Sequence, residues 1–501
     1  MANWTGTESG DLYTGTDFRD ILRGEGGDDV IDGGAGNDDI YGGAGFDLLR
    51  GGAGLDKLYG GDDDDVIVYA LASDLVSGEV IDGGAGVDTI SVGGQTGDNF
   101  NFSVAKISGI EVLDAANETV QFTYSQIAGI FVKTAGTLQL SGTGSLALNG
   151  VVDVATIRLL SGNTSLSLEN AFTNRGSFTV EGSSGNDIVT GNADTGDRLE
   201  GKAGADTLYG LGQNDILIGG LGRDMLFGGD GNDYFFVLSS AEMVGGEVYD
   251  GGDGFDTLQA NSSINLAGVT LRSIETILIF NGDISGAAGQ FNGLSSLEAN
   301  AVNITGTGTA TLPSYAAVGT YNILAKGVTL DLSGVNSINT PVVNGSTSAD
   351  TVIGSRQTET IYGGRGNDVL DGGAGDDVLV GGEDRDTLTG GLGADTFVYT
   401  QRNDSGVNKS DTITDFAAGD TLDLSQVDAD ATVAGDQTFV FVAQGSGAAG
   451  ELFWSYDAGT NVTTLQGDVD GGGILLNDVT AVDFQIFFTG DVTGLGAAVI
   501  L

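Results

Sequence analysis

The sequence predicts an all-β fold, a parallel β-solenoid of nine-residue repeats with β-rich spacer segments. Three observations support this prediction. A glycine-rich, aspartate-bearing pattern recurs every nine residues in three blocks, and the composition includes 88 glycines but only two prolines. Helical periodicity is confined to a short segment at 70–76, whereas the spacers show short alternating stretches typical of strands.

The composition excludes several classes of function. The 501 residues carry a formal net charge of -52, and 55 of the 70 acidic side chains are aspartate. The chain has neither cysteine nor histidine, which excludes a Ser-His-Asp triad, a cysteine nucleophile, the usual zinc sites and haem ligation by those residues. The negative charge disfavours binding to nucleic acid. Oxygen-only ligands suit a hard cation, so multiple calcium ions are the expected cofactor.

The repeats define the organisation of the chain. The pattern G-G-x-G-x-D-x-U-x, in which U is large and apolar, occurs in 21 units, and all but one carry aspartate at the sixth position or its equivalent; the exception is Glu359. Single copies follow the first two blocks at 83–91 and 251–259. The sequence therefore predicts a first repeat block at 1–91, a spacer at 92–181, a second block at 182–259, a spacer at 260–344, a third block at 345–398 and a C-terminal region at 399–501.

Each unit has a clear physical meaning. Its glycines allow positive φ and leave carbonyl oxygens uncovered, its aspartate supplies negative charge, and x-U-x forms a very short strand. Two units make a coil of 18 residues, and coils stack as parallel strands about 4.8 Å apart. Because each coil buries only two apolar side chains, we expect the array to fold only with bound cations. The predicted core positions are Tyr13, Leu22, Ile31, Ile40, Leu49, Leu58 and Ile67 in the first block, and Val352, Ile361, Leu370, Leu379, Leu388 and Phe397 in the third.

With these motifs the sequence resembles the RTX (repeats-in-toxin) calcium-binding proteins and the parallel β-roll that they form. The resemblance implies that calcium is held by the sixth-position aspartates and by carbonyl oxygens of the glycine-rich turns. The implied aspartate ligands are Asp20, Asp29, Asp38, Asp47, Asp56, Asp65, Asp88, Asp187, Asp206, Asp215, Asp224, Asp233, Asp256, Asp350, Asp368, Asp377, Asp386 and Asp395. The implied glycine ligands are Gly33, Gly42, Gly51, Gly219, Gly228, Gly363 and Gly372. Asp197, in a ten-residue unit, and Glu359 depart from the pattern, so weaker or empty sites are expected there.

The C-terminal region resembles that of serralysin-type members of the same family. The string DTITDFAAGDTLDLS at 411–425 carries the likeness, with looser matches at 450–454, 467–472 and 483–486. The resemblance implies a cap on the β-roll and an uncleaved signal for the type I secretion machinery. No N-terminal secretion signal and no transmembrane segment is expected from the polar start and the short apolar runs. The expected location is therefore extracellular, at the cell surface, where calcium would fold the exported chain.

The sequence bears on four possible functions. Because repeats begin at Gly6 and the spacers offer no dense catalytic constellation, the chain is expected not to be an enzyme, and a pore-forming toxin would need long apolar helices. The favoured hypothesis is a calcium-binding structural protein of the cell surface or extracellular matrix, which assembles with itself as a surface layer does. The alternative is a calcium-dependent adhesin or glycan-binding module, with a cell-surface glycan as its partner.

Overall fold

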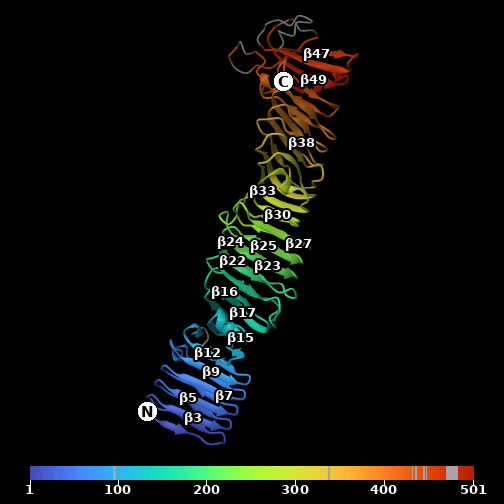
Figure 1. Ribbon diagram of the computed structural model, residues 1–501. Coiled ribbons are helices and arrows are strands. Elements are labelled where there is room, and N and C mark those ends of the chain that lie inside the picture. The colour runs from blue at the N-terminus through green and yellow to red at the C-terminus, as the bar shows by residue number, and fades with distance from the viewer. Residues whose placement is uncertain are drawn as a thin grey trace. The chain divides into compact units, whose positions relative to one another are not determined.

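The computed structural model describes residues 1–93, 98–336, 339–430, 433–434, 437–443, 446, 448–469 and 483–501. They form two compact units. The first comprises Met1–Val237, Gly246–Thr257 and Thr270–Ser273, and the second comprises Leu238–Gly245, Leu258–Val269 and Ile274–Leu501. Figure 1 shows short strands stacked side by side within each unit. Each unit is a parallel β-solenoid, which confirms the predicted fold class.

The first repeat block and the start of the first spacer contribute alternate strands to two parallel sheets. One sheet contains β1 (Asn3–Thr5), β3 (Ile21–Gly26), β5 (Asp39–Ala44), β7 (Lys57–Asp62), β9 (Val80–Ala85) and β12 (Lys106–Ser108). The other contains β2 (Leu12–Thr14), β4 (Val30–Asp32), β6 (Leu48–Arg50), β8 (Val66–Tyr69), β10 (Thr89–Val92) and β13 (Val112–Asp114). Partners lie 18 residues apart, as in Leu22↔Ile40, so one coil is two repeat units, as predicted.

Some strands are longer than the x-U-x segment predicts. β3, β5 and β7 each continue into the next unit, because Gly43 pairs with both Glu25 and Gly61 across neighbouring coils. A glycine at this position permits the close approach of three main chains: a Cβ on Gly43 would overlap the carbonyl group of Glu25. The turns therefore form part of the ladder as well as connecting its strands.

The predicted apolar positions form the core. Leu22, Ile40 and Leu58 follow one another in one sheet and are at most 1% exposed, and Val352, Leu370 and Leu388 are equally buried in the second unit. Tyr13 is the exception, since it is only half-buried and stacks on Trp4 with ring centroids 4.6 Å apart.

The first spacer continues the coils with strands of less regular length. These are β11 (Asn99–Asn101), β14 (Thr119–Thr123), β15 (Phe131–Ser141), β16 (Gly144–Ala147), β17 (Gly150–Leu159), β18 (Thr164–Ser167), β19 (Ala171–Phe172) and β20 (Thr179–Glu181). β13 pairs with β10 at one end of this spacer, and β20 pairs with β22 (Arg198–Ala203) at the other, so parallel pairing runs on from block to spacer and back. Helical structure at 70–76 is limited to the single 3-10 turn η1 (Ala72–Asp74), whereas the short helix α1 (Tyr124–Ile127) is capped by Thr123.

The second block completes the first unit. Its further strands are β21 (Ile188–Thr190), β23 (Thr207–Gly212), β24 (Ile216–Leu221), β25 (Met225–Asp230), β26 (Tyr234–Val237) and β27 (Val248–Asp253). β30 (Thr270–Arg272), from the second spacer, belongs to the same compact unit. Within this part of the unit, β16, β18, β21, β23, β25, β27 and β30 form one seven-stranded parallel sheet.

The second unit holds the second spacer and the third block. The spacer strands are β29 (Ile264–Asn265), β31 (Thr276–Ile279), β32 (Ile284–Gly286), β33 (Ser296–Ile304), β34 (Gly308–Thr311), β35 (Tyr315–Ile323), β36 (Val328–Asp331) and β37 (Val342–Asn344). The block strands are β38 (Thr351–Ile353), β39 (Thr360–Arg365), β40 (Val369–Asp371), β41 (Val378–Glu383), β42 (Thr387–Thr389) and β43 (Thr396–Val398).

The C-terminal region ends the solenoid with antiparallel pairing. β44 (Asp411–Ile413) and β45 (Thr421–Asp423) still pair in parallel with β42 and β43. β48 (Val462–Asp468) then pairs antiparallel with both β47 (Glu451–Asp457) and β49 (Phe484–Thr489). The part of the predicted 467–472 match from residue 470 onward lies outside the described residues.

Candidate metal centre

The sixth-position aspartates form continuous rows along each repeat block. Oδ1 of Asp38 accepts a hydrogen bond from the N–H of Asp20 at 2.7 Å, and Oδ1 of Asp56 accepts one from the N–H of Asp38 at 2.7 Å. The second block repeats this link, for example from the N–H of Asp215 to Oδ1 of Asp233. The link fixes the carboxylate in the ladder, so that its second oxygen faces the glycine-rich turn of its own unit.

That second oxygen is buried and carries no hydrogen bond in most units. Each such Oδ2 atom lacks a partner among the described residues, although buried polar groups are normally satisfied. The aspartates concerned are Asp29, Asp38, Asp47, Asp56, Asp65, Asp88, Asp206, Asp215, Asp233, Asp368, Asp377, Asp386 and Asp395. All are predicted ligands, and all 18 predicted aspartates are buried.

The predicted glycines border a small space beside this oxygen. A Cβ on Gly33 would lie 2.7 Å from Oδ2 of Asp38 and 2.5 Å from the carbonyl oxygen of Gly51. A Cβ on Gly372 would likewise lie 2.6 Å from Oδ2 of Asp377 and 2.7 Å from the carbonyl oxygen of Gly390. A Cβ on Gly42, Gly228 or Gly363 would also contact Oδ2 of the aspartate in its own repeat unit and a carbonyl oxygen of the next coil. A Cβ on Gly51 or Gly219 would contact the carboxylate of its own unit. The absent side chain thus leaves room between a carboxylate oxygen and a carbonyl oxygen from the next coil.

Burial disfavours the ionised form of these carboxyl groups. It raises the pKa of Asp47 to about 6, that of Asp38 to about 7 and that of Asp386 to about 8. The hydrogen bond from the preceding rung acts in the opposite direction but does not offset burial. A bound divalent cation would supply the missing positive charge.

The few basic side chains do not supply that charge. Lys57 Nζ pairs with Asp39 at 2.8 Å, and Arg158 Nε pairs with Glu181 at 2.8 Å. Hydrogen bonds from Arg158 and Lys202 lower the pKa of Glu181 to about 2. Within the described ranges, no ion pair reaches an aspartate whose Oδ2 lacks a hydrogen bond.

The donor set fits calcium bound in the turns. No group of three or more acidic side chains in the described part of the chain could hold a metal by itself. Each candidate site therefore combines one carboxylate with main-chain carbonyl oxygens, which are ligands that calcium accepts. Such sites account both for the Oδ2 atoms that lack a hydrogen bond and for the glycine at the first position of each repeat unit.

Three predicted aspartates are placed differently. Oδ2 of Asp20, Asp187 and Asp350 accepts a hydrogen bond from the N–H four residues earlier, at 2.7 to 2.8 Å. Weaker or empty sites were expected at Asp197 and Glu359, and both accept a similar bond. Oδ2 of Asp197 accepts the N–H of Asn192, five residues earlier, at 2.8 Å, and Oε2 of Glu359 accepts the N–H of Ser355 at 3.2 Å.

The sequence reasoning missed two acids that extend the rows beyond the third block. Oδ1 of Asp411 accepts from the N–H of Asp386 at 2.8 Å, and Oδ1 of Asp420 accepts from the N–H of Asp395 at 3.1 Å. Burial raises the pKa of Asp411 to about 9. The signal lay in the string Asp411-Thr-Ile-Thr, which reads as the second half of a repeat unit without its glycines.

Comparisons with known proteins agree with the geometry. Residues 5–40, 14–49, 41–76, 179–195, 194–226 and 212–238 match the family described as RTX calcium-binding nonapeptide repeat (4 copies). Residues 344–500 match the family described as peptidase M10 serralysin C terminal. A comparison with curated proteins finds no match. None of the described helices is long and apolar enough to span a membrane.

Three solved structures are similar to parts of the chain. The AlgE6R3 subunit of the Azotobacter vinelandii mannuronan C5-epimerase is 30% identical over 33% of this chain and 84% of that one, with a TM-score of 0.24. The AlgE6R2 subunit is 30% identical over 32% and 91%, also with a TM-score of 0.24. The extracellular lipase LipA from Serratia marcescens is 16% identical over 69% and 45%, with a TM-score of 0.20. TM-scores this low give no guide to function.

The repeat pattern, the uncapped carboxylates beside glycine and the two family matches lead to one conclusion. This chain belongs to the RTX calcium-binding nonapeptide-repeat family, carries a serralysin-type C-terminal secretion region, and is a secreted protein that binds multiple calcium ions.

Proposed function

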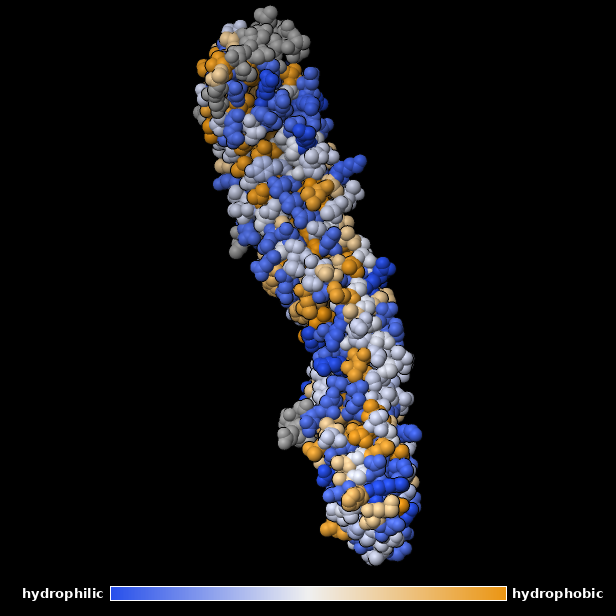
Figure 2. Space-filling view, turned by 90° about the vertical axis from the view of Figure 1, so that its left-hand side faces the viewer, coloured by the Kyte–Doolittle hydropathy of each residue, from blue (hydrophilic) through white to orange (hydrophobic). Residues whose placement is uncertain are grey.

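We propose that this secreted protein is a structural component of the cell surface or extracellular matrix, which assembles with copies of itself and has no catalytic activity of its own. The observation that carries the proposal is a set of large apolar side chains exposed on a strongly acidic solenoid. Phe172 is 63% exposed, Phe255 70%, Tyr315 58% and Leu324 63%. Figure 2 shows apolar side chains at the surface among polar ones. Exposed apolar side chains that gather into a contiguous patch are typical contacts between protein copies.

Calcium has two roles in this proposal. Ions in the turns fold the coils, and ions between copies reduce the repulsion expected from a net charge of -52. Electron microscopy at millimolar calcium should show ordered assemblies that disappear with chelator. Dispersed monomers at millimolar calcium would contradict the proposal.

A paired variant separates assembly from folding. Replacing Tyr315 and Leu324 by serine should reduce assembly without lowering the number of bound calcium ions, because neither side chain lies at a candidate site. Thr358→Ser, a change at another exposed position, is the matched control and should assemble normally. Unchanged assembly in the paired variant would exclude Tyr315 and Leu324 as contacts between copies.

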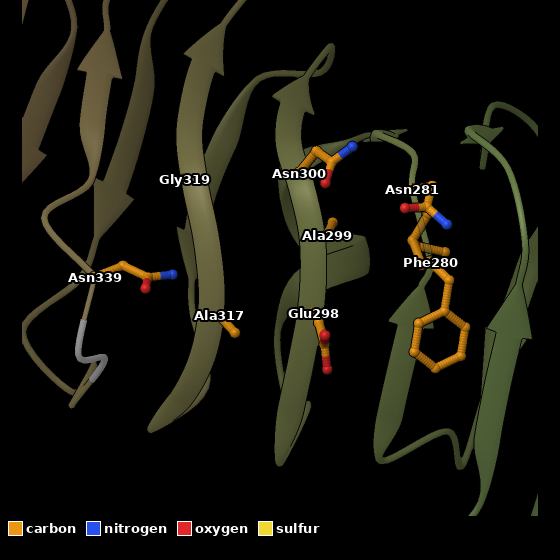
Figure 3. A pocket seen from close by; sticks show the side chains of 9 residues that line it. Phe280, Asn281, Glu298, Ala299, Asn300, Ala317, Gly319 and Asn339 are labelled. Carbon is orange, nitrogen blue, oxygen red and sulfur yellow. The ribbon is translucent and has the colours of Figure 1, made fainter.

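A second candidate function is glycan binding, and a hollow in the second unit favours it. The hollow has a volume of about 460 Å³ and is bordered by Phe280, Asn281, Glu298, Asn300 and Asn339. Figure 3 shows these side chains around a floor of small residues on β33 and β35. Amide and carboxylate groups beside an aromatic ring suit a hydroxyl-rich ligand. A glycan array run with wild type and with Asn300→Ala would test this function. Equal glycan signals from both proteins would exclude the hollow as the glycan-binding site.

A further inference from the structure

The second residue of each repeat unit adopts one of two main-chain conformations. In fifteen units its φ is positive. These residues are Glu25, Gly34, Gly43, Gly52, Gly61, Gly84, Lys202, Leu211, Gly220, Gly229, Gly252, Gly364, Gly373, Gly382 and Gly391. In the other six units φ is not positive, and the residue is always threonine, serine or asparagine. These residues are Thr7, Thr16, Ser183, Asn192, Ser346 and Ser355.

The second conformation turns the main-chain N–H toward the acid of the same unit. The N–H of Thr16 donates to Oδ2 of Asp20 at 2.7 Å, and its hydroxyl donates to the same oxygen at 2.8 Å. Ser183 makes the same two bonds to Asp187, at 2.8 and 2.7 Å. The remaining N–H bonds join Thr7 to Asp11, Asn192 to Asp197, Ser346 to Asp350 and Ser355 to Glu359, at 2.7, 2.8, 2.8 and 3.2 Å.

The conformation of the second residue determines whether the second carboxylate oxygen of the acid in the same unit has a hydrogen-bond partner. Thirteen of the fifteen acids in units with positive φ have a buried Oδ2 without a partner among the described residues. None of the six acids in the other units has such an oxygen. A carboxylate oxygen that already accepts an N–H is satisfied without a cation.

The six units are not scattered along the chain. They form consecutive pairs at 6–23, 182–200 and 345–362, and each pair is the first complete coil of a repeat block. In the second and third blocks this opening coil stacks directly on a spacer strand, since β18 pairs with β21 and β36 pairs with β38. Neither pairing depends on a metal ligand.

We propose that the opening coil of each block holds no calcium, because the chain's own N–H groups, joined in some units by a hydroxyl group, occupy the carboxylate oxygen that faces the cation in later coils. Such a coil stays closed when calcium is absent. It provides a formed edge on which the next 18 residues can add as soon as an ion binds. The spacers and opening coils together thus form the calcium-independent part of the protein.

Matched substitutions test this assignment in the full chain. Asp350→Asn should leave the number of bound calcium ions unchanged, whereas Asp368→Asn, one coil later in the same row, should lower it by at least one. Asp187→Asn and Asp206→Asn form the equivalent pair in the second block. Native mass spectrometry at saturating calcium counts the ions. An equal loss from both members of a pair would overturn the proposal.

The opposite change should create a site. Ser346→Gly removes the hydroxyl and allows the positive φ of the other units, so the protein should bind one more calcium ion than wild type. Ser348→Gly, a change in the same turn that leaves the N–H of Ser346 on Asp350, is the control and should bind the wild-type number. No gain in Ser346→Gly would refute the role assigned to the second residue.

Hydrogen exchange on the unmodified chain gives a test that does not depend on any variant. In chelator, amides of the opening coils at 182–200 and 345–362 should remain protected, while those of the following coils should exchange freely. Calcium should restore protection in the later coils. Simultaneous loss of protection in opening and later coils would overturn the proposal.

Discussion

Filling the space beside Asp377 with a single methyl group should remove one calcium ion. Gly372 has a φ that alanine can adopt, so Gly372→Ala places a Cβ there without main-chain strain. The Cβ would lie 2.6 Å from Oδ2 of Asp377 and 2.7 Å from the carbonyl oxygen of Gly390, whereas ordinary contacts begin at 3.4 Å. The methyl group must therefore displace these oxygens by about 0.7 to 0.8 Å or exclude the ion, and one of the two oxygens belongs to the main chain.

The expected cost has two parts that can be measured separately. Crowding of this kind costs about 1 to 3 kcal/mol at any calcium concentration at which this coil is folded. Loss of one site at about ten times its dissociation constant costs a further ~1.4 kcal/mol, and only when calcium is present. Denaturant unfolding at several calcium concentrations separates the two parts, because only the loss of the site makes the difference from wild type grow with calcium concentration.

The control for this variant lies in the second spacer, in the same compact unit as Gly372. A Cβ on Gly289 would meet nothing within 4 Å, so Gly289→Ala should bind the wild-type number of calcium ions and should be as stable as wild type or slightly more so. If Gly372→Ala matches Gly289→Ala in both calcium count and unfolding midpoint, the space beside Asp377 is not a calcium site.

Three further predictions concern pH, the spacer and the core. Burial raises the pKa of Asp38 and Asp368 to about 7, above an unfolded value of about 3.9, so these groups stabilise the calcium-free fold fully below pH ~4 and lose that effect as the pH rises through about 7. Circular dichroism in chelator should show β structure that declines between pH ~5 and ~8, and a signal that increases with pH would contradict this. Asn322→Ala breaks two amide hydrogen bonds of 2.8 Å to neighbouring asparagines and should cost about 1 to 3 kcal/mol, equally with and without calcium. Leu370→Ala opens a cavity at a fully buried position and should cost about 2 to 5 kcal/mol in denaturant unfolding at saturating calcium.

Much of the fold followed from the nine-residue period. The spacing places Ile40 over Leu22 and Leu58, and the structure confirms this order. The period alone could not reveal that Gly43 joins the ladder, because that pairing depends on main chains approaching from two neighbouring coils. Asp411 was missed for a related reason: its coil is 25 residues long, so it stands outside the nine-residue frame while keeping its place in the row.

The candidate site was only partly readable from sequence. The pattern located the aspartates, and the resemblance indicated the glycines beside them. It treated Asp350 and Asp368 as equivalent because both stand at position six. What distinguishes them is the direction of a main-chain N–H two positions into the unit, which depends on φ at Ser346 and Gly364. That choice between serine and glycine was visible in the sequence, but its meaning required coordinates.

The coil length of 18 residues also limits how the gene can change in length. Removing residues 33–50 would delete one coil and leave every later strand in the sheet to which it now belongs. Removing nine residues would exchange the two sheets for everything that follows. Repeat units tolerate that exchange because they are alike, but the spacers do not, since β15 with eleven residues and β16 with four cannot trade places. The spacers therefore determine which sheet each neighbouring repeat strand must join, and repeat units between them should be gained or lost in pairs.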